Sequence, residues 1–360
     1  MNTLPRTHAR TPEFHALRIS HMRTDEADAI LLAFDVPSHL AHAYAFEAGQ
    51  HLTLRARIDG EELRRAYSIC APAPNGALEV CIRRIDGGRF SNWAMENLAS
   101  GDALDVMTPI GHFTLPPPAE TPAHYVFFAA GSGVTPILSL VSTLLEREPS
   151  AAATLLYVNR SAQTTLFSEE LMALKNRHPH RLALWFHYTR ENADLELFSG
   201  RLTKNRIAAL VEEGLLARDA DAFYLCGPQD LVDTAMAALS EAGVTPARVH
   251  RELFGLAHPP PKPQGAGAGE ASLRVRFQGR ATPAAARSGE NLLEAAARAR
   301  DGLPYACKAG VCSTCRAKVT SGSVEMAANY ALTPEEVAQG FILACQSYAA
   351  SSEVELDFDA

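Results

Sequence analysis

LPYACKAGVCSTCRAKV, residues 303–319, contains three of the seven cysteines of this chain. Cys307, Cys312 and Cys315 follow the pattern C-x4-C-x2-C, and a fourth cysteine, Cys345, lies further along in ILACQS. Three thiolates can reach one compact centre from a single loop only if the backbone turns sharply around that centre. The glycine and the small residues between these cysteines permit such turns. The stretch therefore predicts a loop wrapped around a metal centre.

The spacing of the four cysteines distinguishes between two kinds of metal centre. A C-x4-C-x2-C loop with one distant cysteine is typical of a [2Fe-2S] cluster, in which four thiolates hold two irons bridged by two sulfides. A structural zinc site also takes four cysteines, but usually as two C-x2-C-like pairs from separate knuckles. Because three cysteines here share one loop, we predict a [2Fe-2S] cluster and keep zinc as the alternative. The predicted metal ligands are Cys307, Cys312, Cys315 and Cys345.

The composition is that of a globular protein with more than one domain. The chain has 360 residues, of which 47% are hydrophobic and 21% are charged, values near globular averages. This length suits two or three domains. The formal net charge of −8 argues against a nucleic-acid partner, because that binding needs clustered Lys and Arg. The odd number of cysteines suits a reducing compartment better than a disulfide framework.

The sequence predicts neither a secretory signal nor a membrane span. The N-terminal residues MNTLPRTHARTPEF lack an apolar stretch followed by a small-residue cleavage site. Residues 125–145 carry no charge over a length that could cross a bilayer. Gly131, Gly133 and Pro136 interrupt this segment, however, so we expect a buried strand, a tight loop and a helix there. We therefore expect a cytoplasmic protein with no membrane contact.

Two proline-rich stretches divide the chain. HPPPKPQGAGAGE combines prolines that favour extended backbone with Gly/Ala repeats that favour loose coil, so we expect an exposed linker over residues 257–270. The prolines at residues 116–118 separate short alternating runs such as HLTLRARI, typical of an antiparallel sheet or barrel, from apolar strands that alternate with helical patterns. That alternation predicts a doubly wound parallel sheet with its ligand site at the carboxyl ends of the strands. The expected domains are residues 12–116, 117–256 and 271–360.

R-x-Y-S at Arg65, Tyr67 and Ser68 predicts contacts with a flavin. It provides an aromatic plane to stack on the isoalloxazine, a hydroxyl near its reactive nitrogen and an arginine for the pyrophosphate. By itself the motif is a weak signal, because a tyrosine in a strand is usually half-buried packing. The nearby GGRFSNW leads into a predicted helix whose N-terminus can bind the FAD pyrophosphate. For Arg83 the alternative is a charge on a solvated strand edge. The further predicted FAD-binding residues are Arg83, Gly88, Phe90 and Ser91.

Two short motifs, each after an apolar strand, predict a nicotinamide site. AAGSGVTP, residues 129–136, is expected to open a helix at Pro136, a favoured first helical position. It is not the Rossmann G-x-G-x-x-G, and a lone glycine loop is a weak signal. The second motif is C-G-P at residues 226–228, for which the alternative is a buried strand-end thiol. Their order along the chain favours the site. The predicted cofactor-binding residues in these motifs are Gly131, Gly133, Gly227 and Pro228.

A third strand end bears on the choice between NADPH and NADH. YVNRS, residues 157–161, places a basic residue and a hydroxyl, Arg160 and Ser161, where a 2′-phosphate can be held, whereas an acidic residue would bind the free ribose hydroxyl. Arg190, after the next strand, is a second candidate ligand for this phosphate. For either arginine the alternative is an ordinary surface charge. The sequence therefore favours NADPH.

The order of these motifs resembles the ferredoxin–NADP reductase superfamily followed by a plant-type [2Fe-2S] ferredoxin. The resemblance implies an antiparallel FAD-binding β-barrel, a doubly wound nicotinamide-binding domain and a C-terminal β-grasp ferredoxin domain. In this superfamily G-x-G-x-T-P is the expected glycine loop, which implies that Thr135 lies near the flavin and the nicotinamide. It likewise implies that Cys226 lies beside C4 of the nicotinamide and helps to place the hydride donor over flavin N5. Ser68, Thr135 and Cys226 are therefore the predicted catalytic residues.

The whole arrangement is similar to the reductase subunits of multicomponent oxygenases. The segments that carry the likeness are RAYSIC, YVNRS, CSTCRAKV, NYALTPEEV and the ending DFDA, and they are most similar to reductases of ring-epoxidising enzymes. The resemblance implies that electrons pass from NADPH through FAD and the cluster to a transiently bound di-iron oxygenase that acts on an aromatic acyl-CoA. The alternatives are an NADH-dependent reductase of another oxygenase or hydroxylase, and an iron–sulfur redox sensor without enzymatic activity.

Overall fold

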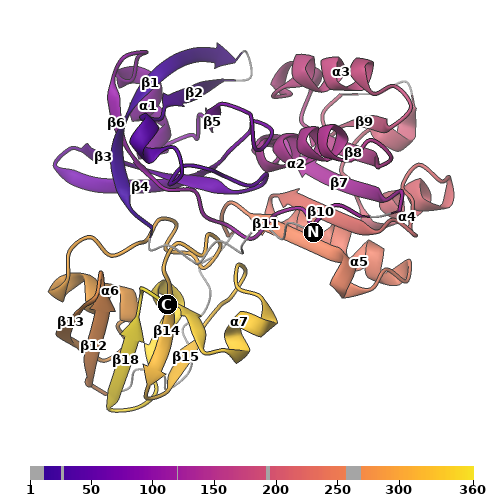
Figure 1. Cartoon of the computed structure of the whole chain (residues 1–360). Helices are drawn as coiled ribbons and strands as arrows, with labels where there is room; N and C mark the ends of the chain where they lie inside the picture. Colours follow the sequence, from indigo (N-terminus) through magenta and orange to yellow (C-terminus); the bar gives the residue numbers. More distant parts are fainter. Residues whose placement is uncertain (1–11, 26–27, 120, 192–194, 257–268) are drawn as a thin grey trace. The chain divides into compact units, whose positions relative to one another are not determined.

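The chain folds as two compact units. The computed structural model describes residues 12–25, 28–119, 121–191, 195–256 and 269–360. A larger unit covers residues 16–257, and a smaller one includes residues 258–360 (Figure 1). The predicted linker, residues 257–270, lies outside the described residues except for its last two positions.

Six antiparallel strands form a barrel in the first part of the larger unit. They are β1 (Phe14–Asp25), β2 (Ala29–Asp35), β3 (His51–Ile58), β4 (Glu61–Ser68), β5 (Leu78–Arg83) and β6 (Ala103–Met107). Their order is β4-β3-β6-β1-β2-β5, and a bridge between Ile69, which follows β4, and Val80 of β5 joins the two edges. Side chains alternate along β3, so that Leu52 and Leu54 lie fully buried in the barrel core. The predicted antiparallel barrel is confirmed.

One helix packs against the barrel. Helix α1 (Arg89–Asn97) begins after the glycine pair of GGRFSNW, as the sequence predicts, and its Phe90 and Ala94 join the barrel core. The face that packs on the barrel carries these two apolar side chains four positions apart, as a helix buried along one side requires. The helix therefore holds its N-terminal turn, and the glycines before it, at a fixed place beside β5.

A parallel sheet forms the second part of the larger unit. Its strands are β7 (His124–Ala130), β8 (Ala152–Asn159), β9 (Leu182–Tyr188), β10 (Ala222–Gly227) and β11 (Val249–Leu253). Its helices are α2 (Val134–Arg147), α3 (Ser168–Arg177), α4 (Lys204–Glu212) and α5 (Gln229–Glu241). The strand order β11-β10-β7-β8-β9 reverses between β10 and β7, so the chain winds in both directions from that point. The predicted doubly wound sheet is confirmed, and such a reversal is where ligands bind in folds of this kind.

The uncharged segment at residues 125–145 forms a strand, a loop and a helix, as predicted. Strand β7 is followed by the 3-10 turn Gly131–Gly133 and then by α2. The helix begins at Val134, so Pro136 is its third residue and not its first. This is compatible with proline, because the first N–H groups of a helix have no intrahelical partner. None of the helices in the described ranges is both long and apolar enough to cross a membrane.

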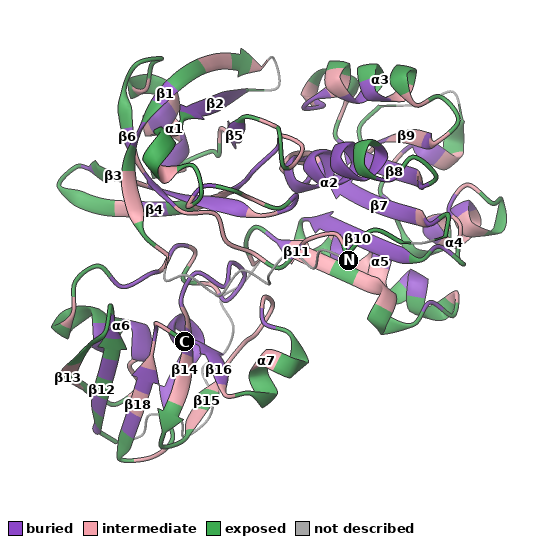
Figure 2. Cartoon of the chain, viewed as in Figure 1, coloured by how far each residue is buried: buried purple, intermediate pink, exposed green. Residues whose placement is uncertain are grey.

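The barrel and the parallel sheet share one hydrophobic core. Leu31 and Cys81 of the barrel belong to the same buried cluster as Phe127 and Tyr224 of the sheet. Figure 2 shows β7, β8, β10 and most of α2 buried. Two hydrogen bonds add to this packing, from Ser139 Oγ to the Ala71 carbonyl at 2.6 Å and from the Ala73 N–H to Thr143 Oγ1 at 2.9 Å. The barrel and the parallel sheet are therefore held together by a shared hydrophobic core and by hydrogen bonds, as well as by the covalent connection between them.

The smaller unit is a β-grasp domain. Its strands are β12 (Ala271–Phe277), β13 (Arg280–Ala286), β14 (Arg316–Ser321), β15 (Val324–Met326), β16 (Phe341–Leu343), β17 (Ser347–Ala349) and β18 (Glu353–Asp357). Its helices are α6 (Leu292–Ala299) and α7 (Pro334–Ala338). The mixed sheet β13-β12-β18-β14-β16 pairs β12 parallel with β18, and α6 buries its apolar face in a separate core with the sheet. The predicted ferredoxin fold is confirmed.

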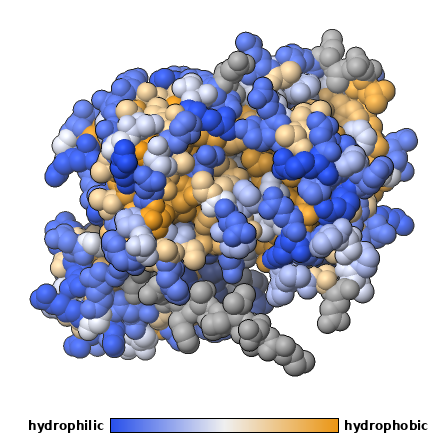
Figure 3. Space-filling view, turned by 45° about the horizontal axis from the view of Figure 1, so that its top comes forward, coloured by the Kyte–Doolittle hydropathy of each residue, from blue (hydrophilic) through white to orange (hydrophobic). Residues whose placement is uncertain are grey.

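Few large apolar side chains are exposed on either unit. Those exposed in the described residues are Ile85, Met172, Leu195, Phe254 and Val337. The face drawn in Figure 3 is mostly hydrophilic, with smaller apolar areas between the polar side chains. A scattered apolar residue on a surface is ordinary, so only those that gather at a cleft call for a functional explanation.

Separate cores predict separate unfolding of the two units. Leu356 lies in the core of the smaller unit and Leu155 in that of the larger, and both are fully buried. A Leu→Ala substitution in a packed core costs about 2–5 kcal/mol. We expect Leu356→Ala to lower the calorimetric transition temperature of the ferredoxin unit alone. Leu155→Ala should lower only the transition temperature of the larger unit. A single transition that shifts equally in both variants would contradict this.

Candidate functional site

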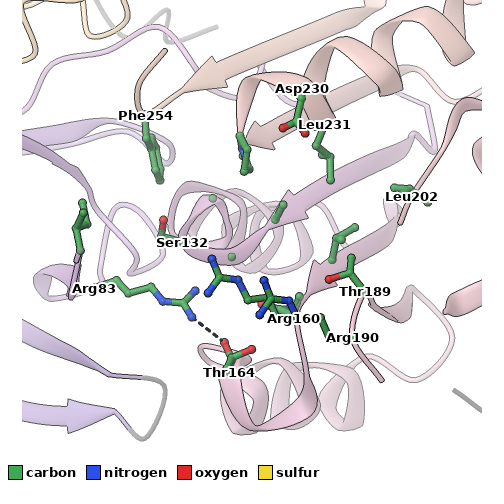
Figure 4. A pocket seen from close by; sticks show the side chains of 18 of the residues that line it. Arg83, Ser132, Arg160, Thr164, Thr189, Arg190, Leu202, Asp230, Leu231 and Phe254 are labelled. Carbon is green, nitrogen blue, oxygen red and sulfur yellow. Dashed lines mark hydrogen bonds between the residues drawn. The ribbon is translucent and has the colours of Figure 1, made fainter. Parts of the chain in front are cut away.

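A cleft of about 1210 Å³ opens at the carboxyl ends of the parallel strands (Figure 4). This volume exceeds that of pockets for drug-sized ligands, about 300–1,000 Å³, and suits a dinucleotide. Barrel and sheet both contribute to its walls. Seven residues predicted from the sequence line it, namely Arg83, Gly131, Gly133, Arg160, Arg190, Gly227 and Pro228.

The two nicotinamide motifs touch each other through their backbones. A Cβ placed on Gly133 would lie 2.2 Å from the Cys226 carbonyl oxygen, and one on Gly227 would lie 2.9 Å from the Ala130 Cβ. Gly131 has a φ of +53°, in the left-handed region. Glycine is therefore required at these three positions. Because glycine has no side chain, the backbone of the loop is open to the cleft.

In the described residues five arginines line the cleft, and three of them, Arg83, Arg160 and Arg190, were predicted from the sequence and come from three different strands. Arg83 extends from β5 and donates to the Thr164 carbonyl at 3.4 Å, as Figure 4 shows. Arg160 follows β8 and Arg190 follows β9. The backbone N–H of Arg190 donates to the backbone carbonyl of Arg160 at 2.9 Å. Both of these side chains are exposed. Neighbouring guanidinium groups at the rim of a cleft can bind the oxygens of a phosphate.

Ser161 has a different local role from the arginine before it. It caps the 3-10 turn Ala162–Thr164, and its hydroxyl lies 3.2 Å from Thr164 Oγ1. The same turn supplies the carbonyl that accepts from Arg83. Ser161 thus orients the turn that follows Arg160 and accepts from Arg83, and its role as a direct phosphate ligand stays a prediction.

The R-x-Y-S motif ends strand β4. The ring of Tyr67 lies 5.9 Å from that of Phe90, and burial raises the pKa of the Tyr67 phenol, so this side chain stays neutral. Phe90 is 1% exposed and belongs to the barrel core, so its side chain supports Tyr67 from within. Arg65 is exposed and donates to the Arg64 carbonyl at 2.7 Å; its contact with a pyrophosphate remains a prediction.

The loop before α1 is shaped to approach an anion. Ser91 Oγ accepts from the Ile85 N–H at 3.2 Å and donates to the Gly88 carbonyl at 3.3 Å. A Cβ on Gly88 would lie 2.6 Å from Ser91 Oγ, so the loop closes only with glycine. Among the residues that the structure describes, no side chain caps the N-terminus of α1, and the first N–H groups of a helix can bind a phosphate. Ser91 therefore shapes the loop, and the backbone is the part suited to bind.

Ser68 and Cys226 are brought together by a residue that the sequence did not single out, Glu252. Ser68 Oγ donates to Glu252 Oε2 at 3.2 Å, and Glu252 on β11 pairs in register with Cys226 on β10. Burial raises the pKa of the Glu252 carboxyl to about 8. Burial, together with Glu252, also raises the pKa of the Cys226 thiol. A carboxyl with a pKa near neutrality, hydrogen-bonded to a serine, can hold or release a proton at working pH.

Thr135 has a structural contact of its own. It is 2% exposed, and its hydroxyl donates to the Ser132 carbonyl at 3.0 Å. This bond ties the glycine loop to the first turn of α2. The predicted catalytic role of Thr135 is left as a prediction.

Phe254 is a second residue that the sequence did not single out. It lines the cleft, as does Ile85, although these two are 44% and 63% exposed. Figure 4 shows the Phe254 ring on the side of the cleft opposite Arg160. An exposed aromatic ring in a cleft, such as that of Phe254, provides the flat contact that a planar ring system needs. The signal in the sequence was an aromatic residue directly after the last strand of the sheet.

In the smaller unit the four predicted metal ligands lie together as two pairs. Cys307 pairs with Cys312, and Cys315 pairs with Cys345. The neighbouring thiol lowers the pKa of Cys307 and of Cys345, and it raises the pKa of their partners. The Ala309 N–H also donates to Cys307 Sγ at 3.3 Å. In each pair, one thiol therefore loses its proton more readily than an ordinary cysteine does.

The paired arrangement suits two irons better than one zinc ion. Two thiolates for each of two irons is the donor set of a [2Fe-2S] cluster. The ligand loop turns sharply at Lys308, Gly310 and Ser313, which have φ values of +54°, +78° and +51°. The sharp turns predicted for this loop are therefore confirmed.

The chain matches three protein families along its length. These are an oxidoreductase FAD-binding domain over residues 17–115, an oxidoreductase NAD-binding domain over residues 127–236 and a 2Fe-2S iron-sulfur cluster binding domain over residues 275–350. The chain therefore contains domains for FAD, for a nicotinamide nucleotide and for a [2Fe-2S] cluster.

Two relatives and one solved structure extend these matches over nearly the whole chain. The chain is 40% identical to a component of the 1,2-phenylacetyl-CoA epoxidase of Escherichia coli (strain K12), over 96% of this chain and 98% of the relative. It is 30% identical to the ferredoxin reductase component of 3-ketosteroid-9-alpha-monooxygenase from Rhodococcus rhodochrous, over 95% and 96%. The fold is similar to that of phthalate dioxygenase reductase, with a TM-score of 0.59, 23% identity and coverage of 96% and 98%.

The raised pKa of Glu252 predicts a pH-dependent stability. The native carboxyl keeps its proton up to about pH 8, whereas its ordinary value is 4.5. The native state therefore binds more protons than the unfolded state between these values, and the free energy of unfolding falls as pH rises through this window. We expect Glu252→Gln to remove this fall, measured by urea unfolding from pH 5 to pH 9.

Glu212→Gln, at an exposed position of α4, is the matched control for that measurement. Its pH profile is expected to run parallel to that of the wild type. Parallel profiles for Glu252→Gln and the wild type would contradict the assignment.

Proposed function

The chain belongs to the family of oxidoreductases that combine FAD-binding, NAD-binding and 2Fe-2S domains and serve as reductase components of oxygenases, and from this we propose that it delivers electrons from NADPH to a di-iron oxygenase that epoxidises phenylacetyl-CoA. The proposal has three parts: the site of hydride transfer, the choice of nucleotide and the outlet to the partner. Each part depends on different residues and is tested separately.

The observation that carries the proposal is the meeting of Ser68, Cys226 and Glu252 where barrel and sheet join. When bound, FAD takes up a two-electron hydride and gives electrons up singly, and a [2Fe-2S] cluster carries one electron. Ser68 ends the motif expected to meet the reactive nitrogen of the flavin. The Ser68 hydroxyl donates a hydrogen bond to the Glu252 carboxylate while Glu252 is ionised. Once Glu252 is protonated, its carboxyl can donate a hydrogen bond to the Ser68 hydroxyl. The pair can thus hold a proton beside that nitrogen near neutral pH.

Cys226 contributes to this site by packing. The residue is fully buried, and burial raises the pKa of its thiol, so the sulfur is neutral and does not act as a nucleophile. A small neutral side chain at this strand end lets the nicotinamide ring approach closely. Gly133, against the Cys226 carbonyl, limits how far that strand end can move.

The arginines at the cleft support NADPH as the donor. Arg160 and Arg190 lie side by side at the strand ends, on the part of the fold where the adenosine ribose binds. Two guanidinium groups match the charge of a 2′-phosphate, which NADH lacks. Arg83 lies across the cleft at the glycine loop, within 3.3 Å of where a Cβ on Gly131 would be. It is placed to neutralise a pyrophosphate.

Cys307, Cys312, Cys315 and Cys345 are the proposed ligands of the cluster. Their arrangement in two pairs and the lowered pKa of one thiol in each pair fit binding by thiolates. Cys307 is the ligand with the most exposure to solvent, so electrons are expected to leave on that side. All seven cysteines are free in the structure, which supports a reducing compartment, the cytoplasm.

The proposed partner is the oxygenase component of a multicomponent system. Support comes from the likeness to the Escherichia coli epoxidase component over nearly the whole of both chains. The alternatives are an NADH-dependent reductase for another oxygenase and a redox sensor. They predict a different outcome when the purified protein is tested for which nucleotide it oxidises and which electron acceptor it reduces.

Arg160→Ala tests the choice of nucleotide. Loss of a charge-assisted contact to a phosphate costs about 1.5–3 kcal/mol, so we expect the KM for NADPH to rise roughly tenfold or more while the KM for NADH changes little. The assay is steady-state reduction of cytochrome c. Arg177→Ala, on an exposed residue at the end of α3, is the control. Equal changes for the two nucleotides would remove the 2′-phosphate assignment.

Reconstitution tests the route of the electrons and the partner together. The purified chain with NADPH, phenylacetyl-CoA and the candidate oxygenase subunits is expected to form the epoxide. Cys345→Ala should abolish this turnover and the reduction of cytochrome c, yet retain reduction of ferricyanide, which can take electrons directly from a flavin. Retained epoxidation in this variant would show that the cluster is not the outlet. Rapid reduction of cytochrome c without epoxidation would point to another oxygenase.

A further inference from the structure

Gln346, the residue after Cys345, is buried beside the thiol of that cysteine. It ends the 3-10 turn Ala344–Gln346 and is 7% exposed. Its side-chain Nε2 donates to the Lys308 carbonyl at 2.9 Å and to Cys345 Sγ at 3.7 Å. One amide group thus contacts both the ligand loop and the distant fourth cysteine.

The orientation of this amide follows from its partners. A backbone carbonyl only accepts, so the end of the amide that faces the Lys308 oxygen must be the NH2 group. That group has two hydrogens and here it has two acceptors, the carbonyl and the sulfur. A flipped amide would place two carbonyl oxygens against each other in a buried site. The donor to Cys345 is therefore fixed by the neighbouring bond.

The ligand loop is shaped to admit this glutamine. Gly310 has a φ of +78°, and a Cβ on it would lie 2.9 Å from Gln346 Cγ. Lys308, which supplies the accepting carbonyl, has a φ of +54°, a conformation that non-glycine residues seldom adopt. The hydrogen bond from Gln346 thus holds the loop at a turn that its own sequence does not favour. A side chain larger than that of glycine at position 310 would collide with Gln346.

A donor at a ligand sulfur affects the two oxidation states of a cluster unequally. Reduction adds one electron, and part of its charge spreads to the thiolate sulfurs. A hydrogen bond to such a sulfur therefore stabilises the reduced state more than the oxidised state and raises the reduction potential.

We infer that Gln346 is a positioning residue that raises the reduction potential of the cluster by donating to Cys345 Sγ and by fixing the ligand loop through the Lys308 carbonyl. The inference rests on the proposed role of Cys345 as a ligand. In the one-electron step no bond forms or breaks, and the electron arrives from the reduced flavin. A higher potential makes the cluster a better acceptor at this step.

Gln346→Met tests the role of the donor, because methionine keeps the length of the side chain and lacks the amide. The full chain is titrated anaerobically while the visible and EPR spectra of the cluster are followed. We expect the equilibrium constant for reduction of the cluster to fall about fivefold, the worth of a typical net hydrogen bond, with shifted g-values. Gln339→Met, at the exposed C-cap of α7, makes the same chemical change elsewhere in the unit and should alter neither readout.

Gln346→Glu serves as a second variant of the same shape. It places an oxygen opposite the Lys308 carbonyl and a negative charge near the sulfur, so an equal or larger fall is expected. An unchanged equilibrium in either variant would overturn the inference. Loss of the cluster from both would also overturn it, because the amide would then be needed for assembly and not for the potential. Wild-type protein without iron would instead refute the proposed function, and the inference with it.

Discussion

The glycine loop after β7 lies with its backbone against the carboxyl end of β10, and the glycines proposed to bind the nucleotide, Gly131, Gly133 and Gly227, lie at or beside this contact. Any side chain on Gly133 would displace the loop from the Cys226 carbonyl. The contact lies where the strand order reverses, so the helices that follow β7 and β10 diverge and leave the cleft between them. The same strand end carries Cys226, and its neighbour in register, Glu252, reaches Ser68 of the barrel.

Hydride transfer and electron transfer make different demands on a protein, and the two units meet them differently. A hydride moves between atoms in near contact, within about 3–3.5 Å, so the groups that hold donor and acceptor must keep a fixed relation. The barrel and the parallel sheet provide this by sharing one buried core and by the hydrogen bonds between α2 and the segment after β4. An electron needs no such contact, and the cluster unit has a core of its own.

Local patterns in the sequence identified what is local in the structure. The C-x4-C-x2-C loop, the glycine loop and the strand-end arginines lie within short segments, and the cleft indeed contains Gly131, Arg160 and Arg190. Glu252 could not be found in this way, because its significance comes from a parallel pairing with β10 and a contact with Ser68. Phe90 was expected to bind the cofactor, and its side chain proves to be 1% exposed in the barrel core, because a helix position beside a glycine loop does not show which way the ring points. The domain boundaries and the linker stay predictions.

Independent cores have a consequence for how such a chain can evolve. In the described residues the buried cluster of the ferredoxin unit runs from Ala271 to Phe358 and contains no residue of the barrel or the parallel sheet. Gene fusion or loss at the junction would therefore add or remove the one-electron outlet without a change to either hydrophobic core. Pairing one hydride-accepting half with different outlets, and so with different terminal enzymes, would then require recombination at a single point in the gene.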